Sequence, residues 1–353
     1  MIRKQTKKIL VGNIPVGGCS EISVQTMTKT KTANAVATIS QIERAAQAGA
    51  DIIRVTVNDE AAAASIKEIV INSPIPVVAD IHFNHIFALA AIDSGVKKVR
   101  INPGNIGNKS KISEVLSAAK SNNVPIRIGV NSGSLEKDIL IKYGAPTAEA
   151  LVESAMRHIQ IANDCNFDEL IVAVKSTSVL TTIDAYRLLS KKTNYPLHLG
   201  VTEAGSVFSG AIKSSVGIGV LLSEGIGDTI RVSLTGEPEE EVGAAIEILS
   251  ALNLRKKYIE LISCPTCGRL DVDLISITKK IEPLLKQIKK RLTVAIMGCV
   301  VNGPGEAKEA DLGIACGKNE AILFVKGQQI KKIKEEDIIS TLLEEIDKMP
   351  GAI

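Results

Sequence analysis

The sequence contains no tryptophan, has few other aromatic residues, and shows no excess of charge of one sign. Aromatic residues make up 3% of the chain, and 42 lysines and arginines stand against 39 aspartates and glutamates. Proteins that bind nucleic acids present a strongly basic surface, and single-strand binders add exposed aromatic side chains. The composition therefore argues against nucleic-acid binding, and any basic site has to come from local placement.

The sequence also lacks a long apolar run and a cysteine framework. No segment approaches the roughly 20 apolar residues that a membrane span requires. The basic segment 1–18 lacks the apolar core of a signal peptide, and it predicts a short hairpin that turns at Gly12 and Asn13. Six cysteines in 353 residues do not make a disulfide scaffold. We therefore expect a reduced, cytoplasmic protein with an aliphatic core and no membrane association.

From residue 22 to residue 250 the sequence alternates β-rich runs with helical stretches. The predicted strands are 22–27, 52–57, 76–81, 97–102, 126–131, 170–175, 197–202 and 229–234. Eight βα units in about 230 residues match a TIM (β/α)8 barrel in number and length. An open doubly wound sheet is the alternative, but no G-x-G-x-x-G motif follows the first strand to support it.

Five of the predicted strands carry a cation where buried barrel strands normally hold Val, Ile and Leu. These cations are Arg54, Arg100, Arg127, Lys175 and Arg231. A buried charge needs a counter-charge, and the candidate acids in the strands, such as Asp80 and Glu203, are fewer than the cations. Pairing inside the barrel, or an outward side chain, therefore explains some of the five but not all.

Several of these cations precede polar strand ends, as in RVTVND, RINPGN and RIGVNSGS. TIM barrels place their active sites at the carboxyl ends of the strands. Arginine offers a fork that matches phosphate oxygens, and lysine adds a point charge. We predict that this mouth binds a small anionic ligand with more than one phosphate. We expect Arg231 to lie lower in the barrel than the other four.

For other polar residues in the predicted strands, the sequence allows either a direct role in the site or a structural role. Glu203 ends the seventh strand, and we expect it to face the mouth as a general acid or as the partner of an arginine. Asp80 and His82 end the third strand, and His198 lies within the seventh. Each histidine has either a direct role or a structural one, and the sequence leaves both open.

A polar segment near residue 254 breaks the alternation, so we predict a barrel domain over 1–253 and a small α/β domain over 254–353. The second domain is predicted to contain strands at 258–263, 292–298, 311–317 and 321–327, and helices at 273–290 and 335–349. Three cysteines fall at the ends of its first two strands: Cys264, Cys267 and Cys299.

The C-x-x-C pair of this domain is shared by redox dithiols, zinc sites and iron–sulfur clusters. Structural zinc usually takes a second close pair, but the cysteines that follow are single. The pattern favours a cluster, with zinc and packing thiols as open alternatives. We expect Cys316, Cys19 and Cys165 to be buried packing thiols.

The segment after Cys299 offers a further ligand. Gly303, Pro304 and Gly305 predict a tight turn that returns Glu306 toward the sulfur atoms. A carboxylate is a harder and more labile ligand to iron than a thiolate, so it could vacate the metal for a substrate. The alternative is that Glu306 is a solvated acid of the loop.

These segments together resemble one family over nearly the whole chain. SCPTCGR and MGCVVNGPGEAKEADLG are similar to the signature of the 4-hydroxy-3-methylbut-2-enyl diphosphate synthases, in their shorter two-domain bacterial form. The strand segments that also match are SVQTMT, DIIRVTV, ADIHF, VRINPGN, RIGVNSGSL, VKST, LGVTEAG and GDTIRVSLTGEP. The resemblance implies reductive ring opening and dehydroxylation of 2-C-methyl-D-erythritol 2,4-cyclodiphosphate, a compound with two phosphates.

The resemblance also implies roles for individual residues. It implies a 4Fe–4S cluster whose ligands are Cys264, Cys267, Cys299 and Glu306. Glu203 matches the acid that helps to expel the hydroxyl as water. The substrate-binding residues would be Arg54, Arg100, Asn102, Arg127, Asn131, Lys175 and Ser233. Flavodoxin or ferredoxin would donate the electrons, and a head-to-tail homodimer would bring each barrel to the cluster domain of the partner.

Overall fold

The structure is a computed structural model of the chain. It describes residues 2–101, 109–255, 258–270, 272–285, 287–288, 290–299, 301, 303–318 and 320–350. The chain divides into two compact units, Met1–Arg255 and Lys256–Ile353. Each unit has its own aliphatic core, so each is described separately.

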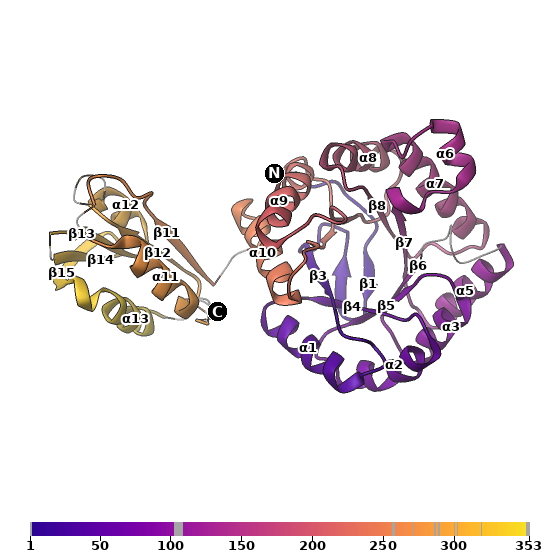
Figure 1. The fold of residues 1–353 in the computed structure, drawn as a ribbon, viewed down its shortest axis with the longest axis horizontal. Coiled ribbons are helices and arrows are strands. Elements are labelled where there is room, and N and C mark those ends of the chain that lie inside the picture. The colour runs from indigo at the N-terminus through magenta and orange to yellow at the C-terminus, as the bar shows by residue number, and fades with distance from the viewer. Residues whose placement is uncertain are drawn as a thin grey trace. The chain divides into compact units, whose positions relative to one another are not determined.

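The first unit is a parallel barrel surrounded by helices (Figure 1). In its described part, eight strands form one sheet in the order β8-β7-β6-β5-β4-β3-β10-β9. A parallel bridge between Val172 and Leu197 joins the two ends of this sheet. The strands are β3 (Ser23–Met27), β4 (Ile52–Thr56), β5 (Val77–Ile81), β6 (Lys98–Ile101), β7 (Ile126–Asn131), β8 (Leu170–Lys175), β9 (His198–Leu199) and β10 (Thr229–Ile230). The predicted TIM barrel is confirmed.

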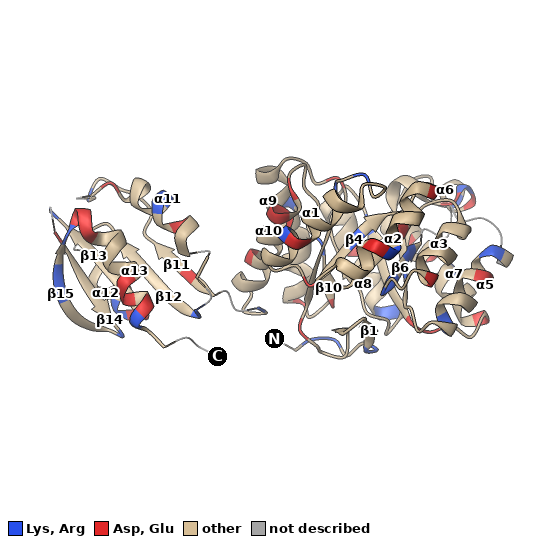
Figure 2. Ribbon diagram, turned by 90° about the horizontal axis from the view of Figure 1, so that it is seen from below, with Lys and Arg blue, Asp and Glu red and all other residues tan. Residues whose placement is uncertain are grey.

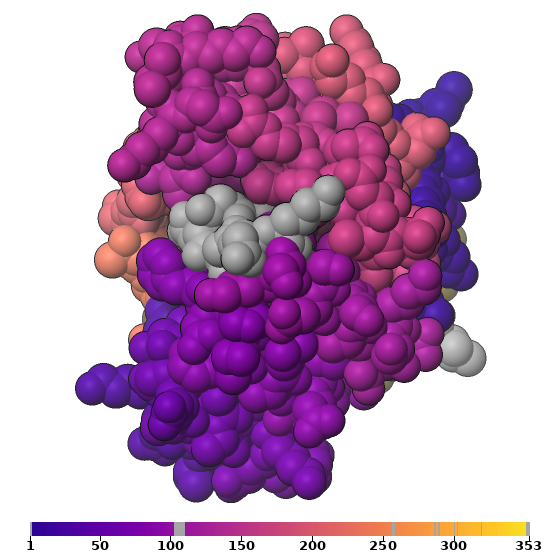
Figure 3. All heavy atoms as spheres, turned by 90° about the vertical axis from the view of Figure 1, so that its right-hand side faces the viewer, coloured from indigo at the N-terminus to yellow at the C-terminus, as the bar shows by residue number. Residues whose placement is uncertain are grey.

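The helices between the strands begin where the sequence supplies a cap. Asn34, Asp59, Thr147 and Ser178 each accept a hydrogen bond from a backbone amide of the first turn. Figure 3 shows the side of the barrel that α3, α5, α6 and α7 cover. The described helices of this unit are α1 (Ala35–Gln47), α2 (Glu60–Asn72), α3 (His85–Asp93), α5 (Lys109–Ser121), α6 (Lys137–Tyr143), α7 (Ala148–Asp164), α8 (Val179–Lys192), α9 (Val207–Ser223) and α10 (Pro238–Ala251).

A hairpin closes the amino end of the barrel. Its strands, β1 (Ile9–Val11) and β2 (Ile14–Val16), pair antiparallel across the predicted turn at Gly12 and Asn13. The side chains of Ile9, Val11 and Val16 are buried against Ile52, Val78 and Ile171, which lie near the starts of β4, β5 and β8. This apolar plug leaves the carboxyl ends of the strands as the open end of the barrel.

The second unit is an α/β layer around a sheet with the described order β11-β12-β13-β14-β15. The strands are β11 (Ile259–Ser263), β12 (Leu292–Met297), β13 (Leu312–Gly317), β14 (Glu320–Val325) and β15 (Gln328–Lys334). The helices are α11 (Leu274–Leu285), α12 (Gly303–Glu309) and α13 (Ile338–Lys348). β15 is an exposed edge strand with lysines, drawn blue in Figure 2, which are typical of protected sheet edges.

Two elements of this unit differ from the sequence prediction. β15 was not predicted, because its residues are mostly polar and its pairing with β14 is what makes it a strand. The tight turn predicted at Gly303, Pro304 and Gly305 is wrong, since these residues form the first turn of α12. Proline is tolerated there because the first amides of a helix have no intrahelical acceptor. In the described part of the chain, no helix is long and apolar enough to cross a membrane.

Candidate active site

A cavity of about 360 Å³ opens at the carboxyl ends of the barrel strands. It is lined by polar residues from at least six strands or strand ends, as expected for a TIM-barrel active site. The lining residues are Met27, Arg54, Thr56, Asp80, His82, Arg100, Arg127, Asn131, Lys175, Thr202, Arg231 and Ser233. All five predicted cations line this cavity, and the expectation that Arg231 sits lower in the barrel stays a prediction.

Asp80 is the acid at the centre of this cavity. Its carboxylate lies 3.0 Å from Arg100 Nη1 and 3.4 Å from Arg54 Nε. Asp80 is paired in register with Arg100 on β6, which brings the two side chains to the same level of the barrel. Burial acts to raise the pKa of Asp80, but Arg54 and Arg100 outweigh it and hold the pKa well below its usual range. This carboxylate is therefore charged and fixes two of the arginines.

Two further cations of the cavity have no acid within ion-pair distance among the residues that the structure describes. Arg127 is 2% exposed, and its Nε and Nη1 atoms have no hydrogen-bond partner among the described residues. Lys175 is also buried. Burial is the main cause that lowers its pKa well below the usual value, and repulsion from Arg127 and Arg231 lowers it further. Unpaired buried cations are costly, and an anionic ligand would relieve that cost. This imbalance is the strongest indication of a phosphate site.

Two further basic side chains are buried inside the barrel: Lys98, which is not among the predicted cations, and His198, whose pKa burial lowers well below its usual value. Lys98 on β6 is fully buried and donates a hydrogen bond of 3.0 Å to Gln25 Oε1. His198 is fully buried too, and neither of its ring nitrogens has a hydrogen-bond partner among the described residues. Lys98 lies two residues before Arg100, so strand alternation could have placed both on the inner face.

Two predicted residues, Glu203 and Asn102, lie outside the cavity lining or outside the described chain. Glu203 is exposed and does not line the cavity, although its neighbour Thr202 does. Its φ of 52° is the left-handed region, which costs a non-glycine residue about 1–3 kcal/mol and is common at functional sites. Asn102 lies outside the described residues. His82 lines the cavity 3.9 Å from Asp80, and burial lowers its pKa more than that acid raises it.

Glycines make room for two of the cavity cations. A Cβ atom on Gly200 would lie 2.5 Å from Lys175 Nζ and 2.6 Å from the carbonyl oxygen of Arg231. A Cβ atom on Gly129 would lie 2.8 Å from Arg100 Nε. These distances are shorter than van der Waals contact. Lys175 and Arg100 can therefore occupy their positions only because residues 200 and 129 have no side chain.

We expect Gly200→Ala to raise KM by roughly tenfold, because the added methyl group displaces the ammonium of Lys175 from the cavity. Steady-state kinetics with the phosphorylated substrate would measure this effect. Gly243→Ala is the matched control, since no atom lies within 4 Å of its Cβ position on α10. An unchanged KM in Gly200→Ala would show that Lys175 does not contact the substrate.

The predicted metal ligands lie in the second unit, at the ends of neighbouring strands. β11 and β12 are parallel, so the segments that carry Cys264 and Cys299 emerge side by side. Cys264 Sγ accepts a hydrogen bond of 3.3 Å from the amide of Gly298. Arg269 is hydrogen-bonded to Cys267, and the charges of Cys267 and Cys299 also raise the pKa of its guanidinium. The three thiols therefore share one corner of the sheet.

Glu306 is exposed on the first turn of α12, the helix that follows this corner. In the described part of the chain, no three histidine, cysteine or acidic side chains already stand as a metal-binding group. The donor set nevertheless fits an iron–sulfur centre, because three thiolates suit iron and a carboxylate supplies a weaker fourth ligand. Cys264, Cys267, Cys299 and Glu306 are therefore the residues that would hold such a centre.

The other cysteines differ in their surroundings. Cys316 on β13 is fully buried, and burial raises its pKa to about 12, which confirms it as a packing thiol. Cys165 is half-buried, at the end of α7. The prediction that Cys19 is buried is wrong, since it is exposed and follows the hairpin with a φ of 59°.

Comparisons with known proteins agree with this division of the chain. Residues 6–246 match the GcpE TIM-barrel domain, and residues 260–348 match the GcpE protein C-terminal domain. A solved dihydropteroate synthase from Stenotrophomonas maltophilia superposes with a TM-score of 0.51 at 13% identity. It covers 70% of this chain and 97% of its own, and it supports the barrel fold alone.

Curated relatives match along the whole length. The chain is 55% identical over 347 residues to the 4-hydroxy-3-methylbut-2-en-1-yl diphosphate synthase (flavodoxin) of Clostridium perfringens, covering 98% of this chain and 99% of the relative. The enzymes of the same name from Clostridium acetobutylicum and Geobacter sulfurreducens are 56% and 52% identical, and each match covers 99% of this chain and at least 99% of the relative. The chain belongs to the GcpE family of 4-hydroxy-3-methylbut-2-en-1-yl diphosphate synthases.

Proposed function

We propose that the barrel mouth holds 2-C-methyl-D-erythritol 2,4-cyclodiphosphate while electrons arrive through the cysteine corner of the second unit. As a member of its family the chain is an oxidoreductase of isoprenoid biosynthesis, which forms (E)-4-hydroxy-3-methylbut-2-enyl diphosphate. The reaction takes up two electrons, opens the ring and releases the hydroxyl as water. The observation that carries the assignment of the mouth is the excess of buried cations over acids.

The roles of the cations in substrate binding differ, because only some of them already have a counter-charge. Arg54 and Arg100 share Asp80, so their guanidinium groups are oriented before the substrate arrives. Arg127 and Lys175 lack an acid among the described residues, so they have the most to gain from the phosphates. Asn131 and Ser233 line the same cavity and offer neutral hydrogen bonds. Asn102 remains a further proposed contact.

The second unit would hold the redox centre. The ligands we propose for a 4Fe–4S cluster are Cys264, Cys267, Cys299 and Glu306, and this is supported by the shared corner of the three thiols. Such a cluster, when bound, would relay electrons to the substrate. The exposed position of Glu306 supports a carboxylate that can move away from the metal.

Glu203 is the proposed acid that protonates the leaving hydroxyl. Support comes from its place in the segment that follows β9, next to Thr202 of the cavity lining. Its left-handed backbone also suggests a position kept for function. To act, its side chain would have to turn toward the substrate, because in this structure it is exposed and outside the lining.

The cavity and the cysteine corner lie in different units of the chain. We therefore propose a head-to-tail homodimer, in which the cluster unit of one subunit covers the barrel of the other. Flavodoxin is the proposed electron donor, as the names of the relatives state for those enzymes. A reducing cytoplasm suits this chemistry, and none of the six cysteines forms a disulfide.

We expect Glu306→Ala to fold with nearly unchanged stability, because the side chain is exposed on a helix. The same change should reduce the iron content of the purified protein and impair turnover. Iron and sulfide analysis of anaerobically purified protein would measure the loss. Glu309→Ala, on the same helix and also exposed, is the control that should retain the iron. Full iron content in Glu306→Ala would remove this residue from the ligand set.

The proposed function is tested by anaerobic turnover of the cyclic diphosphate with reduced flavodoxin. We expect the hydroxylated butenyl diphosphate to form only when reductant is present. The rival is a non-redox phosphate enzyme whose cysteines bind structural zinc. A colourless, zinc-loaded protein with full activity in the absence of reductant would establish that rival.

A further inference from the structure

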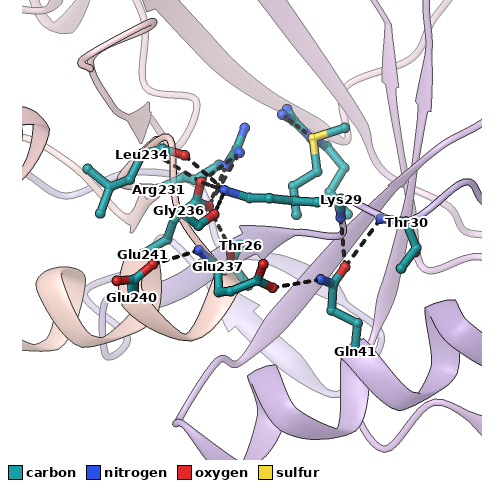
Figure 4. A network of polar contacts seen from close by, with 12 residues as sticks. Thr26, Lys29, Thr30, Gln41, Arg231, Leu234, Gly236, Glu237, Glu240 and Glu241 are labelled. Carbon is teal, nitrogen blue, oxygen red and sulfur yellow. Dashed lines mark hydrogen bonds and ion pairs between the residues drawn. The ribbon is translucent and has the colours of Figure 1, made fainter. Parts of the chain in front are cut away.

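Glu241 of α10 is a buried carboxylate with partners from three different segments (Figure 4). It is 1% exposed. Its oxygens lie 3.3 Å from Arg231 Nε and Nη2, and 3.3 Å from Lys29 Nζ. They also accept hydrogen bonds from Thr26 Oγ1 at 2.7 Å and from the amide of Leu234 at 3.1 Å. The carboxylate thus joins β3, the segment after β10, and α10.

The partners of Glu241 connect it to the lining of the cavity. Arg231 and Ser233 both line the cavity. Leu234, the residue after Ser233, donates its backbone amide to the carboxylate of Glu241. Lys29 holds the same segment from its other side, because its ammonium donates to the carbonyl oxygens of Leu234, at 2.8 Å, and Gly236. The segment 231–236 is therefore fixed through one amide, two carbonyl groups and one guanidinium.

This arrangement parallels that of Asp80 across the cavity. Asp80 binds Arg54 and Arg100, whereas Glu241 binds Arg231 and Lys29. A guanidinium that is held on one edge presents its other donors in a fixed direction, which favours binding of a phosphate. Without the carboxylate, the side chain of Arg231 would become ordered only when the substrate binds, and this loss of entropy would weaken binding.

We infer that Glu241 is a positioning residue for substrate binding, which acts by orienting the guanidinium of Arg231. This inference rests on the proposed function, since it takes the ligand of the mouth to be a diphosphate. Glu241 does not touch the ligand cavity itself. Its effect on binding therefore has to pass through Arg231 and the segment that carries Ser233.

A double-mutant cycle of Glu241→Gln and Arg231→Met tests this route, with KM for the cyclic diphosphate as the readout. The glutamine keeps one acceptor oxygen for the amide of Leu234, and its NH2 group donates to Thr26 Oγ1, but the charge that orients Arg231 is lost. We expect Glu241→Gln alone to raise KM about tenfold with kcat changed less than about threefold. In the Arg231→Met background the same change should leave KM unaltered. If the increases in KM of the two single variants multiply in the double variant, the inference is wrong.

Two further variants separate orientation from a general effect on folding. Thr26→Val removes one hydrogen bond of Glu241 without touching Arg231, so it should lower the unfolding temperature and leave KM unchanged. Glu239→Gln, on the same helix, breaks a surface pair with Arg44 and should alter neither. If Thr26→Val raises KM as much as Glu241→Gln, the route through Arg231 is wrong. Should Glu241→Gln fail to fold, Glu241→Asp replaces it, because its shorter side chain withdraws from Arg231.

Failure of the proposed function would be recognised separately. If the wild-type protein does not convert the cyclic diphosphate, the reaction assignment is wrong, and the cycle is then measured with the affinity for inorganic diphosphate. Coupling between Glu241 and Arg231 in that affinity would support the positioning role, and its absence would refute it.

Discussion

Replacing Cys299 by serine is expected to abolish turnover of the cyclic diphosphate. Cys299 lies just beyond the end of β12 and follows Gly298, whose amide donates to Cys264, so it belongs to the shared corner. A hydroxyl is a poor ligand for iron compared with a thiolate. The variant should therefore lose the redox centre while the barrel keeps its affinity for the substrate. Iron analysis, product formation and calorimetric binding measure the three quantities on one preparation.

Cys316→Ala is the matched control, because this thiol packs in the core of the same unit. It should lower the unfolding temperature but retain the iron and the activity. Loss of substrate affinity in Cys299→Ser would indicate that the variant misfolds beyond its metal site. A Cys299→Ser protein with full iron content and full activity would contradict the ligand assignment.

Replacing Lys175 by methionine is expected to weaken binding and to stabilise the protein at the same time. The lysine is buried among cations with no acid nearby in the described chain, and an apolar side chain of similar length removes that repulsion. Replacing buried charges by apolar groups can raise the free energy of unfolding by about 1–4 kcal/mol. The loss of one charged contact to phosphate should raise KM roughly 10- to 100-fold. Thermal unfolding and kinetics measure the two effects.

Arg100→Met supplies the contrast, because it removes a partner of Asp80 and leaves this buried acid with Arg54 as its remaining close arginine. It should weaken binding and also destabilise the protein. If both variants lower the unfolding temperature equally, Lys175 has a counter-charge that the described residues do not include. If neither changes KM, the mouth is not the phosphate site.

The sequence predicted the barrel well because each strand is a short buried run and each helix repeats an apolar face. It also identified the five cations of the mouth, since a charge in a buried strand is conspicuous. Lys98 and His198 were harder to assign, because only the register of the neighbouring strands shows how deep in the barrel they lie.

Other features depend on contacts between distant segments, which a pattern of residues does not contain. In the sequence, Glu241 is one of several acids at the start of α10. Only the folded barrel shows that it is buried against Arg231 and Lys29. Gly303, Pro304 and Gly305 predict a loop but form the first turn of α12, because glycine and proline are common in both. Glu203 is predicted at the mouth, but its side chain is exposed and does not line the cavity, which depends on the backbone of the segment after β9.

Electron paramagnetic resonance of the reduced protein, purified without oxygen, examines the redox centre and the substrate site together. The spectrum should contain the signal of a reduced 4Fe–4S cluster, and addition of the cyclic diphosphate should change it. Arg127→Met protein should keep the signal but require far more substrate for the same change. A protein that shows no iron–sulfur signal yet converts the cyclic diphosphate at the full rate would contradict the proposal.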